Sequence, residues 1–214
     1  MKLTRLTRKE LHIVAAGKGL IKGPLIFLYN ELSTEFSNGG QIPENWDHCK
    51  IKFIEKINAI LVIEKETIFH YLKEFNFPNT LLLCGKGYPC ERTREFLHFL
   101  NRCIINVCIY ALVDNDPHGL HIYSIYKNGS RSRKDLAVNS IDLLGLKTDQ
   151  FERNMLPLSK RDLSILKCLL ASEDLTIHSE ATALLQRSSK CELESLIENE
   201  KFLQLLKDNF LIKK

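Results

Sequence analysis

The chain has 214 residues, 44% of them hydrophobic, which is enough for a packed core and argues against an intrinsically disordered protein. Its 30 Lys and Arg residues against 26 Asp and Glu residues give a net charge of +4, which permits a nucleic-acid partner without requiring one. No apolar run approaches the roughly 18 residues of a membrane span, so we expect no membrane association.

Three short apolar runs punctuate the first half of the chain: Ala59–Ile63, Thr80–Leu83 and Val107–Val113. Each run is too short for a stable helix and shows no polar alternation, which is typical of strands buried on both faces of a parallel sheet. Helical patterns over Glu66–Phe75 and Pro89–Asn101 separate the runs. The alternation predicts an α/β fold with a mostly parallel sheet flanked by helices.

The remaining elements follow in chain order: a helix over Leu120–Tyr126, an exposed polar loop over 127–134, a strand over 140–146, a helix from Ser159 and a Leu-rich helical segment over 191–212. Ser159 and Asp162 have the spacing of a capping box. We expect a connecting segment with the first sheet elements over residues 1–50, a core over 51–150 and a helical C-terminal extension over 151–214.

The seven cysteines, an odd number, include no pair at zinc-binding spacing. We expect Cys84, Cys103 and Cys108, which lie in apolar strand-like runs, to be buried free thiols. Free thiols are typical of a reducing compartment.

Acidic residues follow two of the apolar runs. Asp114 and Asp116 are two residues apart after the third run, so in an extended chain their side chains point the same way. Glu64 ends the first run, and the carboxyl ends of parallel strands share one edge of the sheet. We therefore predict that the three carboxylates bind Mg²⁺. The alternative is structural: Asp116 starts a turn before Pro117 and Glu64 caps the next helix.

Basic residues follow the second run. In Gly85-Lys86-Gly87, two glycines flank a lysine, which lets backbone amides approach an anion, and Arg92 and Arg94 come early in the next helix. A simple strand-to-helix turn explains the loop equally well. Arg131 and Arg133 in the polar loop are candidates for following a nucleic-acid backbone, and a solvated loop is an equal alternative.

These motifs together resemble a known family. The segments Val62–Glu66, Gly85–Pro89 with Arg94, and Leu112–Gly119 are similar to the topoisomerase–primase (Toprim) domain of the A subunit of DNA topoisomerase VI. They are closer to its eukaryotic relative, the meiotic double-strand-break protein (sporulation protein eleven). The similarity continues through 122–130, 136–146 and 156–162, and begins near Lys18.

The resemblance implies a Toprim, Rossmann-like fold in a DNA-cleaving machine of the topoisomerase class that initiates meiotic recombination. Glu64, Asp114 and Asp116 would be the catalytic metal residues for Mg²⁺, and Lys86, Tyr88 and Arg94 would contact DNA. It also implies a homodimer, partners that are a B-type ATPase subunit or meiotic accessory proteins, and a nuclear, chromosomal location (cytoplasmic in a prokaryote).

The sequence departs from the family pattern in three respects. Cys90 stands where the family usually has Asp, and Asn115 where it usually has Ala. The family's nucleophilic tyrosine belongs to an N-terminal domain, and none of the six tyrosines here lies in that motif. We expect a truncated, incomplete or degenerate chain that binds metal and DNA without cleaving. The alternatives are a self-sufficient metal-dependent nuclease and an inactive dimerisation or DNA-binding module.

Overall fold

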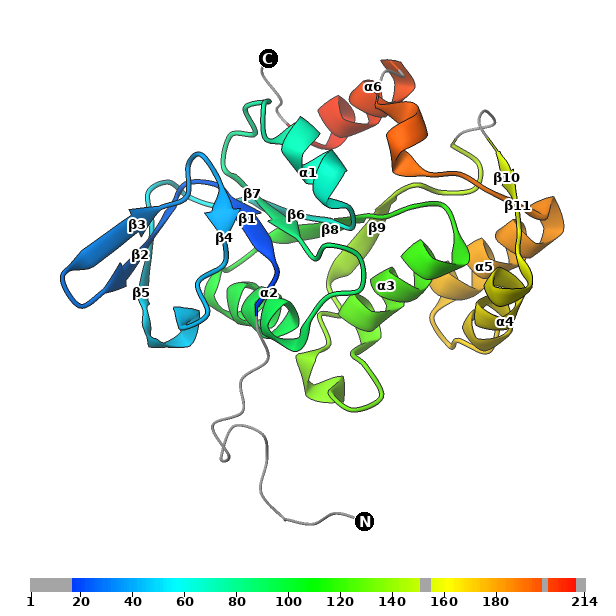
Figure 1. The fold of residues 1–214 in the computed structure, drawn as a ribbon, viewed down its shortest axis with the longest axis horizontal. Coiled ribbons are helices and arrows are strands. Elements are labelled where there is room, and N and C mark those ends of the chain that lie inside the picture. Colours follow the sequence, from blue (N-terminus) through cyan, green and yellow to red (C-terminus); the bar gives the residue numbers. More distant parts are fainter. Residues whose placement is uncertain (1–16, 151–154, 198–199, 211–214) are drawn as a thin grey trace, which may run out of the picture.

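A computed structural model describes residues 17–150, 155–197 and 200–210, and its centre is a six-stranded sheet in the order β4-β1-β7-β6-β8-β9 (Figure 1). The strands of this sheet are β1 (Leu20–Lys22), β4 (Gly40–Gln41), β6 (Ala59–Ile63), β7 (Thr80–Cys84), β8 (Cys108–Leu112) and β9 (Ile141–Gly145). Strands β7, β6, β8 and β9 run parallel, and β1 pairs antiparallel with β7. The mostly parallel sheet predicted from the apolar runs is confirmed.

Helices cover both faces of the sheet (Figure 1). Side chains of β6 alternate between the faces: Ile60 and Val62 pack in the cluster with α2 (Glu91–Cys103) and α3 (Pro117–Asn128), while Leu61 and Ile63 pack with α1 (Glu66–Leu72) and α6 (Glu200–Asn209). This two-sided burial explains why the strand carries no polar alternation. The predicted helices were right in kind, but α1 ends three residues earlier than expected and α3 runs longer than expected at both ends.

A second, three-stranded antiparallel sheet, in the order β3-β2-β5, is formed by strands that lie between β1 and β6 in the chain. Its strands are β2 (Leu25–Tyr29), β3 (Leu32–Glu35) and β5 (Lys50–Phe53). The bounds of these strands are not predictable from apolar runs alone. Strand β3 is exposed along its whole length and β5 is at most half-buried, so neither leaves an apolar run.

The C-terminal part contains α4 (Lys160–Leu169), α5 (Leu175–Arg187), the short pair β10 (Leu156–Pro157) and β11 (Ser189–Lys190), a 3₁₀ turn over Leu193–Leu196, and α6. The helical reading of 191–212 was therefore wrong at its start. Cys191 is extended and forms an antiparallel bridge with Asn115. Leu193 and Leu196 belong to a 3₁₀ turn, and their side chains are buried. Residues 198–199 and 211–212 of that segment lie outside the described residues.

Of the three cysteines expected to be buried, Cys84 is buried, but Cys103 and Cys108 are exposed. Cys103 is the last residue of α2 and Cys108 the first of β8, so both lie at element ends rather than inside the core. The three-part division of the chain stays a prediction. Within the described residues, no helix is both long enough and apolar enough to cross a bilayer.

The predicted capping box at the start of α4 is present. Asp162 N donates to Ser159 Oγ (3.2 Å) and Ser159 N donates to Asp162 Oδ2 (2.8 Å). We expect Ser159→Ala to lower the free energy of unfolding by about 1 kcal/mol, because one amide of the first helical turn loses its acceptor. Urea denaturation measures the change. The exposed Ser164→Ala on the same helix is the control, and equal effects of the two substitutions would contradict the capping role.

Candidate functional site

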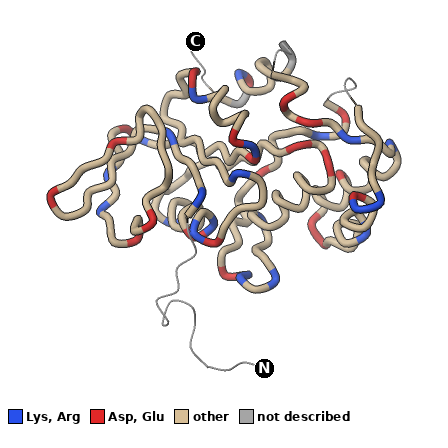
Figure 2. The backbone as a smooth tube through the Cα atoms, in the orientation of Figure 1, with Lys and Arg blue, Asp and Glu red and all other residues tan. Residues whose placement is uncertain are grey.

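The three predicted acidic residues come together where β6 and β8 end. Glu64 follows β6, Asp114 and Asp116 follow β8, and the two strands are parallel neighbours with Ile63 paired to Leu112. Asp114 N donates to Glu64 Oε2 at 2.9 Å. All three side chains are buried, with 7%, 5% and 8% exposure for Glu64, Asp114 and Asp116. Acidic stretches from separate parts of the chain approach one another here (Figure 2).

Burial makes these carboxylates costly to ionise together. The pKa of Glu64 is raised to about 8, mainly because the carboxyl group is buried away from solvent and secondly because the Asp114 carboxylate repels its charge. Loss of solvent also raises the pKa of Asp114 to about 6, although the Lys65 ammonium acts against that shift. Such a group of acids binds either a proton or a cation near neutral pH.

The structure also tests the structural roles predicted as alternatives for Asp116 and Glu64. Asp116 Oδ1 accepts a hydrogen bond from Gly119 N (2.6 Å), so Asp116 caps α3, where the structural alternative expected it only to start a turn before Pro117. Glu64 does not cap α1, whose N-cap residue is Lys65, and it instead accepts the bond from Asp114 N. Capping uses one oxygen of Asp116 and leaves Glu64 without a helix-capping role.

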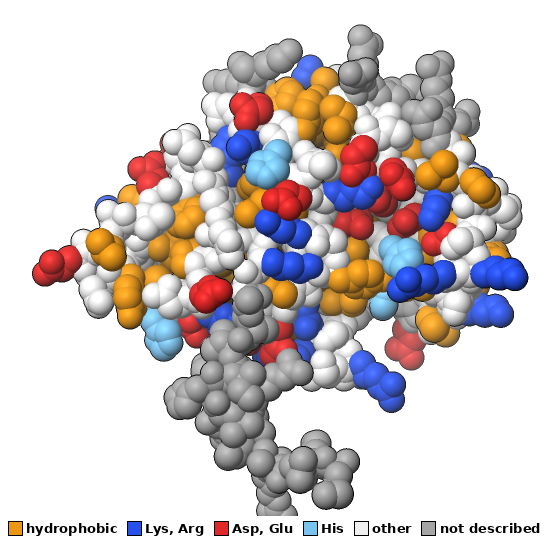
Figure 3. Space-filling model, in the orientation of Figure 1, with side chains coloured by type: hydrophobic (Ala, Val, Ile, Leu, Met, Phe, Trp, Pro, Cys, Tyr) orange, Lys and Arg blue, Asp and Glu red, His pale blue; other side chains and the backbone are white. Residues whose placement is uncertain are grey.

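A segment from the C-terminal part, residues 191–194, crosses the acid site, and we call it the strap. Leu193 N donates to Asp114 Oδ1 at 2.8 Å, and Lys65 Nζ lies 2.8 Å from Asp114 Oδ2. The same Lys65 ammonium contacts Glu194 and lies 3.7 Å from Glu192 Oε2. Basic and acidic side chains lie close together on this side of the molecule (Figure 3). The sequence reading missed the strap because more than seventy residues separate it from Asp114.

The site fits Mg²⁺ in the chemistry of its donors, because hard divalent cations prefer carboxylate oxygens. Glu64 and Asp116 each use one oxygen for a hydrogen bond and keep the other free of hydrogen bonds from the described residues. Both oxygens of Asp114 are engaged. Among the residues that the structure describes, no three His, Cys, Asp or Glu side chains are gathered closely enough to hold one ion. Glu64 and Asp116 therefore each keep one carboxylate oxygen that a cation would find unoccupied, whereas both oxygens of Asp114 are already engaged.

The Gly85-Lys86-Gly87 loop lies beside the acid site, but its amides do not face an anion. Gly85 N donates to Ile63 O (3.1 Å) and Gly87 N to Glu64 O (2.8 Å), so the expectation of free loop amides was wrong for both glycines. The Lys86 ammonium pairs with Glu66 at 2.8 Å. The two glycine amides thus bind the backbone at the end of β6, which leaves the Lys86 side chain, and not these amides, to contact an anion.

Tyr88, the residue that follows Gly87, is exposed, with an exposed fraction of 40%. Its hydroxyl lies 3.2 Å from His118 Nδ1 and 3.0 Å from His121 Nδ1, both on α3. Burial and the nearby charges of Asp116 and Glu64 raise the pKa of Tyr88. A neutral hydroxyl held by two imidazoles suits hydrogen bonding to a polar ligand at the rim of the acid site.

The four arginines predicted to bind DNA differ in whether their guanidinium groups already have partners within the described residues. Arg92 pairs with Asp47 (2.8 Å) and Glu95 (3.1 Å), and Arg133 pairs with Asp135 (2.8 Å), Glu95 (3.2 Å) and Glu91. Arg94 is buried and donates to Ser130 Oγ at 3.0 Å. Arg131 is exposed and forms no ion pair with any described residue. The bonds of Arg94 and Arg133 tie the loop after α3 to the start of α2.

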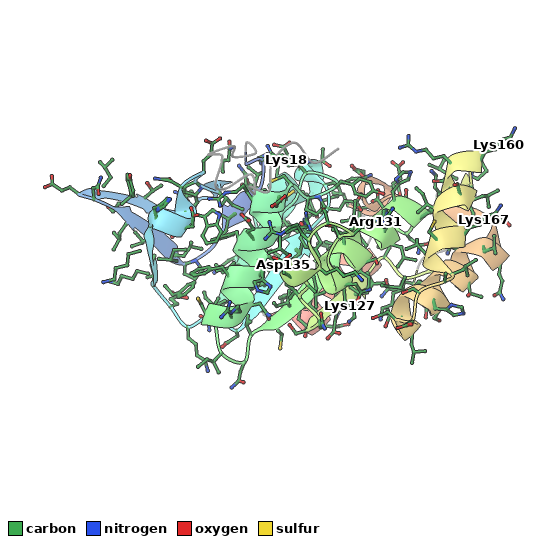
Figure 4. All side chains as sticks on the ribbon, turned by 90° about the horizontal axis from the view of Figure 1, so that it is seen from below. Lys18, Lys127, Arg131, Asp135, Lys160 and Lys167 are labelled. Carbon is green, nitrogen blue, oxygen red and sulfur yellow. The ribbon has the colours of Figure 1, made fainter. Side chains whose placement is uncertain are left out.

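Two further cations to which the sequence analysis assigns no role, Lys160 and Lys167, lie on α4. Both project from α4 in Figure 4, where Arg131 is also labelled. They are exposed and have no ion pair with the described part of the chain. Their spacing of seven residues places them on one helix face, a signal that was present in the sequence.

The chain is similar to proteins of one family over most of its length. The profile of the topoisomerase 6 A-subunit/Spo11 Toprim domain matches residues 59–214. Meiotic recombination protein SPO11-4 of Oryza sativa subsp. japonica is 35% identical over 185 residues, covering 78% of this chain and 38% of the relative. Meiotic recombination protein rec12 of Schizosaccharomyces pombe is 31% identical over 208 residues, covering 90% and 58%.

Meiotic recombination protein SPO11 of Homo sapiens is 30% identical over 216 residues, covering 91% of this chain and 54% of the relative. The chain thus spans about half the length of the curated relatives it matches. The family profile covers the sheet strands from β6 onward, the three carboxylates and the strap. The chain therefore belongs to the topoisomerase 6 A-subunit/Spo11 family and carries its Toprim domain.

Proposed function

We propose that this chain is the Mg²⁺-dependent, DNA-binding Toprim part of a DNA double-strand-break transesterase that acts in meiotic recombination. The single observation that carries the proposal is the convergence of Glu64, Asp114 and Asp116 at the ends of two neighbouring parallel strands. The names of the relatives, all meiotic recombination proteins, support the biological setting. A nuclear, chromosomal location, a homodimer and accessory partners or a B-type ATPase subunit belong to the same proposal.

The roles follow from the contacts. Glu64, Asp116 and Asp114 would hold Mg²⁺, which when bound supplies positive charge next to a DNA phosphate. Lys86, whose ammonium pairs with Glu66 in this structure, would turn to the phosphate backbone, Tyr88 would donate a hydrogen bond, and Arg131 would extend the contact. Arg94 and Arg133, whose guanidinium groups bond to protein atoms, would act by fixing the loop that carries Arg131 to the start of α2, and Arg92 would hold α2 to the segment around Asp47.

We propose further that none of the six tyrosines of this chain is the nucleophile, so that it binds DNA without cutting it. Incubation with supercoiled DNA and Mg²⁺ tests this statement. We expect no covalent protein–DNA adduct and no nicked product after detergent and protease treatment. A covalent adduct would contradict the proposal. Nicked DNA with free 5′-phosphates and no attached protein would instead identify the alternative, a nuclease that uses metal-activated water.

The DNA-binding proposal predicts a definite salt dependence. We expect Lys86→Ala and Arg131→Ala each to weaken binding to a duplex of arbitrary sequence and to reduce the slope of log affinity against log salt by about 1, because each removes one phosphate contact. Fluorescence anisotropy with a labelled duplex at several NaCl concentrations measures both quantities.

The control is Lys50→Ala, an exposed lysine on β5 in the separate three-stranded sheet, which makes the same change in net charge. We expect it to leave the salt slope unchanged. If the slopes of all three variants fell equally, the binding would reflect net charge alone and the assigned contacts would be wrong.

A further inference from the structure

The Lys65 ammonium is shared between the acid site and the strap. It lies 2.8 Å from Asp114 Oδ2, contacts Glu194 Oε2 and lies 3.7 Å from Glu192 Oε2. The Asp114 side chain is 6% exposed, whereas those of Glu194 and Glu192 are 36% and 48% exposed. One cation therefore bridges a buried carboxylate and two carboxylates nearer to solvent.

The strap is held in place by bonds that do not involve Lys65. Leu193 N donates to Asp114 Oδ1 at 2.8 Å, and the backbones of Asn115 and Cys191 exchange two hydrogen bonds of 3.0 Å. Glu194 Oε1 accepts from Thr67 Oγ1 at 3.0 Å. Glu194 is thus a fixed carboxylate. It remains within reach of the Lys65 ammonium whether or not that ammonium also contacts Asp114.

A divalent cation on Asp114 Oδ2 and an ammonium 2.8 Å from the same oxygen repel each other strongly. We infer that Lys65 is an internal counter-ion that occupies Asp114 in the metal-free protein, and that Glu194 receives this ammonium when a divalent cation binds. Lys65 is then a positioning residue that sets the metal affinity of the site. The inference rests on the metal site proposed above and says how that site admits its ion.

The first test removes the counter-ion. Lys65→Met keeps the length and the apolar stem of the side chain and deletes the ammonium. We expect MgCl₂, titrated by calorimetry into the full chain without DNA, to bind about tenfold or more tightly, equivalent to about 1.4 kcal/mol. The control is Lys56→Met, the same charge change at an exposed position just before the other end of β6, which we expect to shift the Kd less than twofold (~0.4 kcal/mol).

The second test removes the alternative partner. We expect Glu194→Gln to weaken Mg²⁺ binding about threefold or more, because the ammonium is then left with Asp114 as its nearest carboxylate. In the Lys65→Met background the same Glu194→Gln change should have no effect, since no ammonium remains to be relocated. Glu192→Gln, an equal change of charge at the longer contact, should act more weakly than Glu194→Gln in the natural background.

The outcomes separate this inference from the metal site itself. If Asp114→Asn abolishes Mg²⁺ binding but Lys65→Met leaves the Kd within twofold (~0.4 kcal/mol) of the natural protein, the inference is overturned and the metal site stands. If Glu194→Gln weakens binding equally in both backgrounds, the effect is long-range electrostatics and the inference is again overturned. If no variant binds Mg²⁺, including Lys65→Met, both proposals fall.

Discussion

Replacement of Gly119 by alanine is expected to destabilise the protein by about 3 kcal/mol, because the added methyl group has no space. A Cβ atom at this position would lie 2.3 Å from Asp114 O, 2.9 Å from Asp114 N and 3.0 Å from Glu64 Oε2. Two of these atoms are backbone, which cannot turn aside as a side chain does. The start of α3 would have to move away from the end of β8 and carry Asp116 with it.

Gly87→Ala is the matched control for this prediction. Gly87 has a φ of +77°, and no atom lies within 4 Å of the position that a Cβ would take, so alanine there meets only the backbone cost of about 1 to 2 kcal/mol. Thermal or urea denaturation of both variants measures the difference. A Gly119→Ala protein that is as stable as Gly87→Ala would show that α3 and β8 are not packed as closely as the structure describes.

The sequence was sufficient to predict the parallel core and the meeting of the acids. Both follow from short-range rules: apolar runs without alternation form buried parallel strands, and residues after such strands share an edge. Glu64, Asp114 and Asp116 lie at the ends of β6 and β8 for this reason. The capping box at Ser159 was predictable because its two bonds span only three residues.

What the sequence did not predict depends on contacts between distant residues. Nothing in the order of residues shows that Leu193 N binds Asp114 or that Glu194 shares the ammonium of Lys65. The same holds for Arg92 and Arg133, which look like exposed cations in the sequence. Their availability was decided by carboxylates at Asp47 and Glu91, which only the folded chain brings close. Charge type is readable from sequence, but charge pairing is a property of the tertiary structure.

The pH dependence of stability provides the second large effect, and Glu64 is its main source. Its pKa is about 8 in the folded protein against an ordinary 4.5, so between these values the folded state holds a proton that the unfolded state has lost. Stability therefore falls as pH rises through this window and levels off above pH 8. The raised pKa of Asp114, about 6, acts in the same direction at lower pH.

In the metal-free protein we expect the free energy of unfolding to fall by about 2 kcal/mol between pH 6.5 and pH 8, at 1.36 kcal/mol for each pH unit. Glu64→Gln resembles the protonated carboxyl and keeps an oxygen for Asp114 N, so it should remove this slope and make the protein more stable than the natural chain at pH 8. Urea denaturation in the presence of EDTA measures both effects. Glu66→Gln, the exposed neighbouring acid, should retain the slope of the natural protein. A slope that persists in Glu64→Gln would mean that a different group holds the proton, and that Glu64 is already ionised and available to a cation at pH 6.5.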